Sequence, residues 1–363
     1  MTDPTPLDGP ASGIPDLTPG RLPEPELAPT TPAYGPATTA TPQGHEAGGY
    51  ALVLGEALVD IVEHEGEEPV EHVGGSPANV ALGLARLGHA VELATWFGTD
   101  ARGDSIRTHL TGDRVTISTG SELAGHTSTA HARIDADGVA DYTFDLDWDL
   151  PGTEPLRPPT LVHTGSLAAV VAPGALKVLE AMERYRDTAT LTYDPNVRPA
   201  LMGTPAQARP LIERLVSLAD VVKVSDEDLA WLAPGDDIRE VAGDWVGLGA
   251  GIVVVTLGGR GALAVTAGGV EVDVAAPRVD VADTVGAGDS FMSGLIDGLW
   301  RASLIGADRR EALRGISRTA LADALARAVQ VAAITVSRAG ANPPSLVELT
   351  ATAPPVPPTP RPL

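Results

Sequence analysis

The sequence predicts an α/β fold in which a doubly wound, mostly parallel sheet is flanked by helices and carries a small β-ribbon lid. Short apolar runs alternate with longer amphipathic segments along most of the chain, as is typical of parallel strands joined by helices. Two β-rich segments in the first half interrupt that alternation, and each surrounds a short polar turn. With 363 residues, of which 43% are hydrophobic, the chain can bury the core that such a fold requires.

The predicted strands are short and apolar. In chain order they are 50–58, 90–97, 160–167, 189–196, 220–225 and 251–259. Most of them precede a helical segment, and the clearest helical patterns are 77–88, 173–186, 205–218 and 226–233. Ligands in such sheets bind beyond the carboxyl ends of the strands, so we expect the functional residues at those ends.

The two interruptions, residues 58–73 and 126–147, predict antiparallel ribbons. In each, β-rich runs flank a polar turn, such as the Asp-Gly pair at residues 137 and 138. We expect the ribbons to form a lid that closes over a substrate. Their edge strands also favour a homodimer, because an unpaired strand edge can pair with its copy on a second subunit.

Both ends of the chain lack the periodicity of helices and strands. Residues 1–49 are rich in Pro, Thr, Gly and Ala, and residues 350–363 are rich in Pro. Such compositions are typical of disorder. The sequence therefore predicts one folded unit at residues 50–349 between a disordered leader and a disordered tail.

The composition argues against several classes of protein. Acidic residues number 48 and basic residues 25, and the resulting net charge of −23 argues against a nucleic-acid partner. No apolar run reaches the ~18 residues of a membrane span, and the N-terminus lacks a signal-peptide pattern, so we expect a cytoplasmic protein without a membrane partner. The chain has no cysteine, so any catalysis must use oxygen, nitrogen or backbone groups.

The segment DTVGAGDSFMSGL, residues 283–295, combines glycines, an aspartate and the start of a helix. Apolar residues recur at helical spacing within and after it, so we expect the helix to begin close to Gly288 or Asp289. The first amides of a helix have no internal partner and attract an anion. Gly286 and Gly288 would let this backbone approach a phosphate closely.

The sequence leaves two interpretations of Asp289. One is an N-terminal cap or first-turn acid, which is common in helices. That role leaves the neighbouring glycines unexplained, whereas an aspartate that acts on a hydroxyl, beside amides that hold a phosphoryl group, explains both. Other motifs fit less well: Phe291 replaces the last glycine of a dinucleotide fingerprint, a P-loop is absent, and Ser290 lies in no G-x-S-x-G motif.

A second segment, GGSPANVALGLARLG at residues 74–88, also predicts a helix start. We expect Ser76 as its N-cap and Pro77 as its first residue. Asn79, on the first turn, is either a solvent-facing or capping amide or a hydrogen-bonding group where the preceding glycines let a polyol approach the backbone. Asp60, just past the first strand, is either a solvated loop acid or an acceptor for two sugar hydroxyls.

Together, these segments resemble the ribokinase-like (PfkB) carbohydrate kinase family. GGSPANVALGLARLG is similar to the first signature of the family, and DTVGAGDSFMSGL is similar to its second, more specific one. Both occur in the family's order and separation, and the likeness extends from about residue 50 to residue 349. GEALVDIV, LTYDPNVR, VVKVSDEDLAWL and AAITVSRAGANPPS look most like bacterial fructokinases.

The resemblance implies an ATP-dependent kinase whose ligands are ATP and a small-molecule sugar. It implies that Asp289 is the catalytic base. The implied anion hole is the backbone of Gly286, Ala287 and Gly288. The implied sugar-binding residues are Asp60, Gly74, Gly75, Asn79, Arg133 and Arg198. The implied nucleotide-binding residues are Lys223, Thr256, Gly258 and Gly261.

The resemblance also implies Mg²⁺ and a monovalent cation, K⁺. Family members often carry an N-x-x-E motif near the metal, and this chain has Ser225 and Asp228 at the two defining places. Because aspartate is shorter than glutamate, Glu227 is a further candidate beside Asp228. Asp283 matches an acid near the family's monovalent-cation site.

The sequence leaves the acceptor open. Fructose or a similar ketose agrees best with the fructokinase-like segments. A nucleoside or phosphosugar kinase of the same family is an alternative, and so is a catalytically silent sugar-binding regulator, although a pure sensor has no need of the base at Asp289. With only three Phe, five Tyr and five Trp, the chain favours a sugar over a nucleoside, which needs aromatic stacking.

Overall fold

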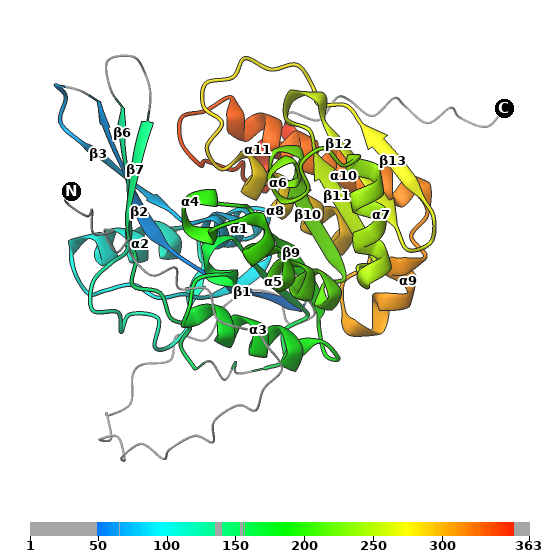
Figure 1. Cartoon of the computed structure of the whole chain (residues 1–363), viewed down its shortest axis with the longest axis horizontal. Helices are drawn as coiled ribbons and strands as arrows, with labels where there is room; N and C mark the ends of the chain where they lie inside the picture. Colours follow the sequence, from blue (N-terminus) through cyan, green and yellow to red (C-terminus); the bar gives the residue numbers. More distant parts are fainter. Residues whose placement is uncertain (1–48, 65, 135–139, 153–154, 156, 352–363) are drawn as a thin grey trace, which may run out of the picture.

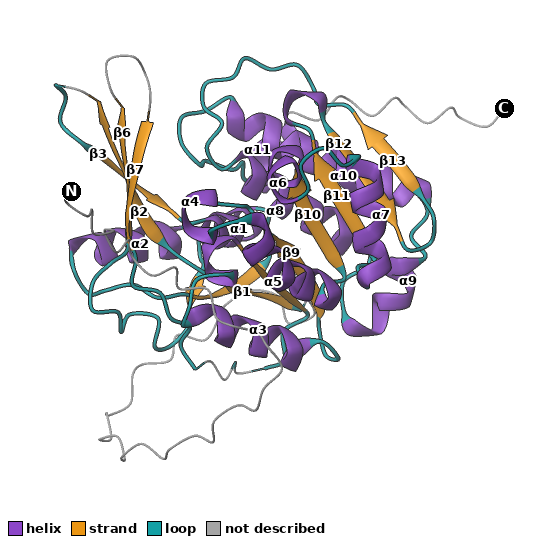
Figure 2. Ribbon diagram, in the orientation of Figure 1, coloured by secondary structure: helices purple, strands orange, loops and turns teal. Residues whose placement is uncertain are grey.

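The structure, a computed structural model, describes residues 49–351 apart from 65, 135–139, 153–154 and 156. A nine-stranded sheet lies among helices, and a four-stranded sheet projects to one side of it (Figures 1 and 2). The predicted α/β fold, with a mostly parallel sheet and a small β-ribbon lid, is therefore confirmed.

The large sheet has the strand order β13-β12-β11-β10-β9-β8-β1-β4-β5. Its strands pair in parallel, except that β12 and β13 form an antiparallel edge. The bounds are β1 (Tyr50–Leu54), β4 (Ala90–Ala94), β5 (Thr116–Ile117), β8 (Leu161–Gly165), β9 (Thr190–Asp194), β10 (Val221–Ser225), β11 (Ile252–Thr256), β12 (Ala262–Thr266) and β13 (Glu271–Val274). The six predicted strands correspond to β1, β4 and β8 to β11, whereas the β12–β13 hairpin was not predicted.

Helices cover both faces of this sheet, because successive strand residues point to opposite sides. Leu52 and Leu54 of β1 enter the core formed with α3, α5 and α7, while Ala51 and Val53 enter the core formed with α1, α8 and α10. The helices are α1 (Ser76–Arg86), α2 (Ala101–Gly112), α3 (Gly174–Tyr185), α4 (Pro199–Met202), α5 (Pro205–Leu218), α6 (Asp226–Leu232), α7 (Ile238–Leu248), α8 (Ala287–Arg301), α9 (Arg310–Arg314), α10 (Arg318–Val336) and α11 (Leu346–Ala351).

The two predicted ribbons are present as antiparallel pairs, and they join into one four-stranded sheet, here called the lid sheet. β2 (Leu58–His64) pairs with β3 (Val70–Gly74), and β6 (Thr129–Ile134) pairs with β7 (Ala140–Asp145). Parallel pairing of β2 with β6 gives the order β3-β2-β6-β7. A small apolar cluster that includes Leu58, Ala130 and Leu167 packs the lid sheet against the short 3-10 helix Ser166–Ala169 that follows β8.

Among the described helices, α10 has the length and composition of a membrane span. It is packed closely against α8, however. A Cβ added at Gly294 or Gly298 of α8 would lie 2.8 Å from the Cα of Ala328 or Ala324 of α10, respectively. The two helices thus meet backbone to backbone in the core, as core helices of globular proteins do.

The predicted leader lies outside the described residues up to residue 48, and so does the predicted tail from residue 352. Residues 350 and 351, which were predicted to belong to the tail, are the last residues of α11.

Candidate active site

The first turn of α8 forms the centre of the site. Gly286 is its N-cap and has a φ of 72°, a left-handed conformation that glycine adopts without strain. The helix starts at Ala287, one or two residues before the predicted start at Gly288 or Asp289, and the amide of Ala287 donates to Thr284 O at 3.2 Å. In the described part of the chain, the amides of Gly286, Gly288 and Asp289 donate to no protein acceptor. Those three amides remain available to an anion.

The side chain of Asp289 contacts α1. Ser76 Oγ donates to Asp289 Oδ1 at 2.6 Å, and Asn79 Nδ2 donates to Asp289 Oδ2 at 2.8 Å. The carboxylate therefore receives its bonds from another helix and does not cap α8. The predicted N-cap role of Ser76 is wrong: Gly75 holds that position and Ser76 is the first residue of α1. Sequence reasoning missed this role because Ser76 and Asp289 lie far apart in the chain.

The surroundings of Asp289 make it a stronger base than an ordinary aspartate. It is 8% exposed, and burial raises its pKa. The hydrogen bonds from Ser76 and Asn79, and the charges of Lys223 and Arg198, offset part of that rise. A carboxylate with a raised pKa, fixed in place by two donors, is suited to accept a proton.

A buried ion pair lies beside this turn. Lys223 of β10, which is 3% exposed, donates to Asp194 Oδ2 of β9 at 2.9 Å. A Cβ added at Gly288 would lie 2.9 Å from Lys223 Nζ, so the ammonium lies against the start of α8. Burial opposes the charge of Lys223, but nearby carboxylates, Asp194 foremost, raise its pKa. Asp194 was not predicted, although an acid at the end of a buried strand was an available signal.

Asp60 lies on β2 of the lid sheet, within the first predicted ribbon, and is not a solvated loop acid. Burial raises the pKa of its carboxyl to about 6, while the charge of Arg198 acts to lower it and that of Asp289 to raise it. The charges of Arg198 and Asp289 thus both act on the Asp60 carboxyl group.

The two glycines before α1 allow close approaches around Asp60. A Cβ added at Gly74 would lie 1.9 Å from Asp60 Oδ2. Gly75 has a φ of 104°, and a Cβ there would lie 2.4 Å from the carbonyl oxygen of Glu56. Larger residues at these positions would displace Asp60 or the start of β2.

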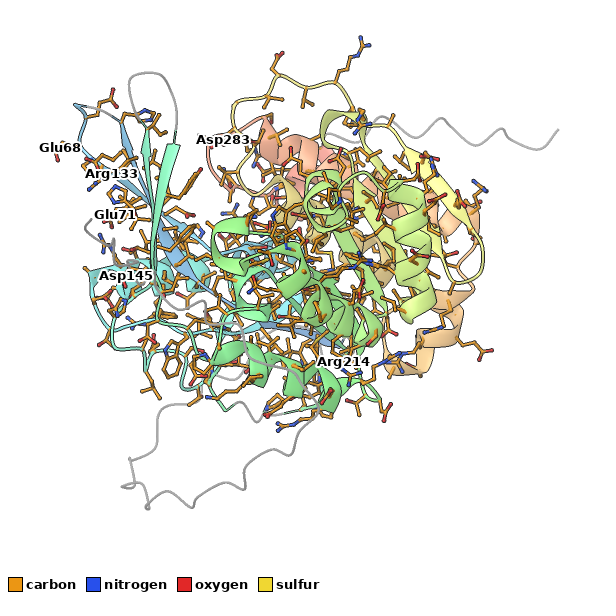
Figure 3. All side chains as sticks on the ribbon, viewed as in Figure 1. Glu68, Glu71, Arg133, Asp145, Arg214 and Asp283 are labelled. Carbon is orange, nitrogen blue, oxygen red and sulfur yellow. The ribbon has the colours of Figure 1, made fainter. Side chains whose placement is uncertain are left out.

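The two predicted arginines lie in different surroundings. Arg198 follows β9, and its charge acts on both Asp60 and Asp289. Arg133 lies on β6 with a 68% exposed side chain, and it forms an ion pair with Glu63 at 3.1 Å. Figure 3 shows Arg133 on the lid sheet, near other labelled acidic side chains. Arg198 is therefore the arginine better placed to act beside Asp289.

The predicted nucleotide-binding residues gather at the ends of β10 and β11. Thr256, the last residue of β11, pairs in register with Ser225, two residues after Lys223. Gly258 and Gly261 form the next turn, with φ values of 55° and 107°. A Cβ at Gly261 would lie 2.0 Å from a carbonyl oxygen of β13, so this turn requires glycine.

The acids predicted for Mg²⁺ differ in availability. The oxygens of buried Asp228 accept bonds from the amides of Val197 at 2.9 Å and Ser225 at 3.1 Å. Glu227, its neighbour, is exposed on the first turn of α6. The described residues contain no group of three His, Asp or Glu that could hold a metal by themselves. Mg²⁺ is commonly held by one or two carboxylates together with substrate phosphates, and Glu227 fits that mode better than Asp228.

Asp283, predicted near a monovalent cation, forms hydrogen bonds with the loop before α8 and with the loop at Gly340. Its Oδ1 accepts from the amide of Val285 at 3.0 Å, and its Oδ2 accepts from the amide of Gly340 at 2.8 Å. Asp283 precedes α8, and Figure 3 shows it away from the lid sheet on which Arg133 lies. Each oxygen keeps a second lone pair, so the carboxylate can still contribute to a cation site.

Known proteins are similar to this chain over the residues that form both sheets. The pattern of the pfkB family carbohydrate kinase matches residues 50–348. A fructokinase from Klebsiella pneumoniae is 33% identical over 260 residues, which are 69% of this chain and 84% of that protein.

Solved structures show the same similarity. A double mutant of fructokinase from Vibrio cholerae O395, in fructose, ADP and potassium ion bound form, superposes with a TM-score of 0.69 and 26% identity, covering 83% of this chain and 97% of that one. Aminoimidazole riboside kinase from Salmonella enterica, complexed with aminoimidazole riboside and an ATP analog, gives a TM-score of 0.67 and 27% identity, covering 83% and 99%. Every predicted site residue lies within the residues matched by the family.

Proposed function

The chain belongs to the pfkB family of carbohydrate kinases and is a phosphotransferase with an alcohol group as acceptor, and from this premise we propose that it transfers the γ-phosphoryl group of ATP to a hydroxyl of fructose or a similar ketose. The observation that carries the proposal is the position of Asp289, a buried carboxylate held by two donors beside three free amides. This arrangement combines a base with a site for a phosphoryl group.

In the proposed reaction, Asp289 takes the proton of the attacking sugar hydroxyl while Ser76 and Asn79 keep its carboxylate in place. The amides of Gly286 and Gly288 stabilise negative charge on the transferring phosphoryl group. Of the predicted anion hole, Ala287 contributes position but not its N–H, which is bonded to Thr284.

The nucleotide is proposed to lie along the ends of β10 and β11, over Thr256 and the turn from Gly258 to Gly261. Lys223 would add a positive charge beside the phosphates. Mg²⁺, when bound, would offset phosphate charge, and Glu227 is the residue proposed to hold it, with Asp228 ordering the turn.

The acceptor is proposed to be neutral. Asp60 and Asn79 offer hydrogen-bonding groups for sugar hydroxyls, and Gly74 and Gly75 leave room beside them. The two acids Asp60 and Asp289 would repel a phosphosugar, and Arg198 supplies a single opposing charge. These charges favour fructose over a phosphorylated acceptor.

A nucleoside-like acceptor is the second candidate. It is supported by the similarity to aminoimidazole riboside kinase, which was solved with aminoimidazole riboside. Because both candidates present sugar hydroxyls, the residues around Asp289 do not favour one over the other. The part of the acceptor beyond the sugar is what separates them.

K⁺ is proposed to bind near Asp283, where that carboxylate joins the loop before α8 to the loop at Gly340. The fructokinase from Vibrio cholerae was solved with a potassium ion. A K⁺-dependent kcat, lost in Asp283→Asn, would support this site. Equal activity in Na⁺ and K⁺ for both proteins would contradict it.

A cytoplasmic location is also proposed.

A homodimer through the lid sheet is a further proposal. The dimer is supported by the exposure of Val70 on edge strand β3 and of Tyr142 on edge strand β7, at 53% and 59%. Sedimentation of the wild type and of a Val70→Lys, Tyr142→Lys variant tests the dimer. A monomeric wild type would contradict it.

The experiment that tests the function is a coupled assay of ADP release with fructose, ribose, 2-keto-3-deoxygluconate, adenosine, aminoimidazole riboside and fructose phosphates. The highest kcat/KM is expected with fructose. Asp289→Asn serves as the matched control, because it keeps the shape of the side chain and removes the base. Sugar binding without ADP release in the wild type would instead indicate a regulator.

A further inference from the structure

A chain of hydrogen bonds runs from Arg198 into the protein interior. Arg198 Nη1 donates to Asn196 Oδ1 at 2.9 Å, and Asn196 Nδ2 donates to Ser166 Oγ at 3.2 Å. Beyond Ser166 lies the buried carboxyl group of Glu56, which accepts from the amide of Ala168 at 3.0 Å and whose pKa the Ser166 hydroxyl lowers. The chain thus links the loops that follow β1, β8 and β9.

The donors in this chain all point the same way. A guanidinium can only donate, so the oxygen of the Asn196 amide faces Arg198 and its NH₂ group faces Ser166. Ser166 then has one hydrogen, which it gives to Glu56. The guanidinium thus sets the direction of each bond from its own end, and the Ser166 hydrogen is left to face Glu56. Glu56 is 6% exposed.

Two of the linking residues have unfavourable backbone conformations. Ser166 has a φ of 57° and Asn196 a φ of 40°, and the described residues contain only two other non-glycine residues with positive φ, Arg114 and Ser303. Next to Ser166, a Cβ at Gly165 would lie 2.1 Å from the carbonyl oxygen of Asp194. Strained residues persist where the surrounding structure requires them, and they concentrate at functional sites. Here the strain brings the two side chains into the chain of bonds.

The charge of Arg198 acts on Glu56, Asp60 and Asp289. The hydrogen bond from Arg198 to Asn196, which in turn bonds Ser166, holds the arginine at the carboxyl ends of β9 and β8, whereas Lys223 lies against the start of α8. Arg198 itself is exposed. An exposed arginine has many rotamers, and holding it in one of them lowers the entropy lost when a ligand binds.

We propose that Glu56, Ser166 and Asn196 are positioning residues that hold Arg198 in one orientation toward the acceptor sugar and thereby set the affinity for the acceptor. This inference rests on the proposed function of the site as a sugar kinase. The series of side chains Glu56, Ser166 and Asn196 is here called the relay. Arg198 Nη1 also donates to the carbonyl oxygen of Val197 at 3.0 Å, and this main-chain contact persists when the side chain of Asn196 is removed. The relay is thus separable from the fold of the loop.

The first test is Asn196→Gly, because glycine tolerates the positive φ and removes only the amide. The KM for the sugar is expected to rise about tenfold, as for loss of a hydrogen bond to a charged group, with the KM for ATP nearly unchanged. Ser303→Gly is the matched control: it relieves a positive φ at an exposed position after α8 and should leave both KM values unchanged. An equal rise in both KM values for Asn196→Gly would overturn the proposal.

The second test is a double-mutant cycle with Arg198→Lys. If Asn196 acts through Arg198, the KM for the sugar in Asn196→Gly, Arg198→Lys should match that of Arg198→Lys alone. Additive effects would overturn the relay. Asn196→Asp, which can still accept from Arg198, should lie between wild type and Asn196→Gly. A wild type that releases no ADP with any sugar contradicts the proposed function, whereas an active wild type with a wild-type sugar KM in Asn196→Gly contradicts the relay alone.

Discussion

Asp289 and Asp297 lie on the same helix, about two turns apart, and both are buried, yet their surroundings shift their pKa values in opposite directions. The two oxygens of Asp289 accept from the neutral side chains of Ser76 and Asn79. Burial raises the pKa of Asp289, and these neutral donors offset only part of the rise.

Asp297 is surrounded by basic side chains instead. His89 Nε2 lies 2.8 Å from Asp297 Oδ1, Arg301 Nε lies 3.1 Å from Oδ2, and Arg327 also contacts Oδ2. Burial would raise the pKa of Asp297, but the bond to His89 and the charge of Arg327 bring it below the usual value. Neutral donors therefore leave a buried acid basic enough to accept a proton, whereas cations fix it as a structural anion.

Replacing Asp289, the acid with the raised pKa, should have the largest effect, and this effect should be on activity alone. Asp289→Asn is expected to lower kcat by about 10²–10⁴-fold, because it removes the general base. Stability should be unchanged or higher, since the variant no longer buries a carboxylate. ADP release and thermal unfolding measure the two effects. A near-normal kcat would contradict the assignment of Asp289.

Replacing Asp297, the acid paired with basic side chains, should instead lower stability and leave activity unchanged. Asp297→Asn leaves Arg327 and Arg301 without their counter-ion, so we expect a loss of about 3 kcal/mol in the free energy of unfolding. The kcat of the folded fraction should remain near that of the wild type. Urea unfolding combined with ADP release tests this, and a stable but inactive variant would contradict the distinction between the two acids.

Glu56 is a third buried acid with neutral donors, and burial raises its pKa from 4.5 to about 7. The folded state therefore binds the proton more tightly than the unfolded chain, and the contribution of Glu56 to stability falls as the pH rises through that window. Glu56→Gln should remove a decrease on the order of 3 kcal/mol between about pH 5 and about pH 8. Urea unfolding at both pH values measures it, and parallel pH dependences for wild type and variant would rule it out.

Removing one neutral donor should give the smallest effect. Ser76→Ala deletes a hydrogen bond that lowers the pKa of Asp289, so the acidic limb of the pH–rate profile should move to higher pH. We expect kcat/KM near neutral pH to fall about tenfold, with Asn79 still holding the other oxygen. Ser76→Thr, which keeps the hydroxyl, is the control. A limb that moves to lower pH would show that Ser76 does not stabilise the carboxylate.

Local pattern predicted much of this molecule. The apolar runs identified β1, β4 and β8 to β11, and the glycines before Asp289 marked the start of α8 to within two residues. These features depend on neighbours in the sequence, such as alternation, helical spacing and turn residues. The fold class followed from their order along the chain.

Contacts between distant residues were not predictable in that way. The cap role expected of Ser76 is common in serines before a helix, but its hydroxyl is used by a residue 213 positions away. The partner of Lys223, the cluster around Asp297 and the relay behind Arg198 likewise join separate strands and loops. Tertiary structure decides these pairings, and a local preference is overridden when a buried carboxylate needs a donor.

The location of Asp60 on β2 places one proposed acceptor contact in a different part of the molecule from the groups proposed to transfer the phosphoryl group. Asp60 belongs to the lid sheet, whereas Asp289 and the free amides belong to the start of α8. Substitutions in the lid strands can therefore alter the choice of acceptor while the phosphoryl-transfer machinery is inherited unchanged. Among the proposed acceptor residues, Asp60 can therefore change together with the lid sheet, whereas Asn79 on α1 and Arg198 after β9 belong to the body of the molecule.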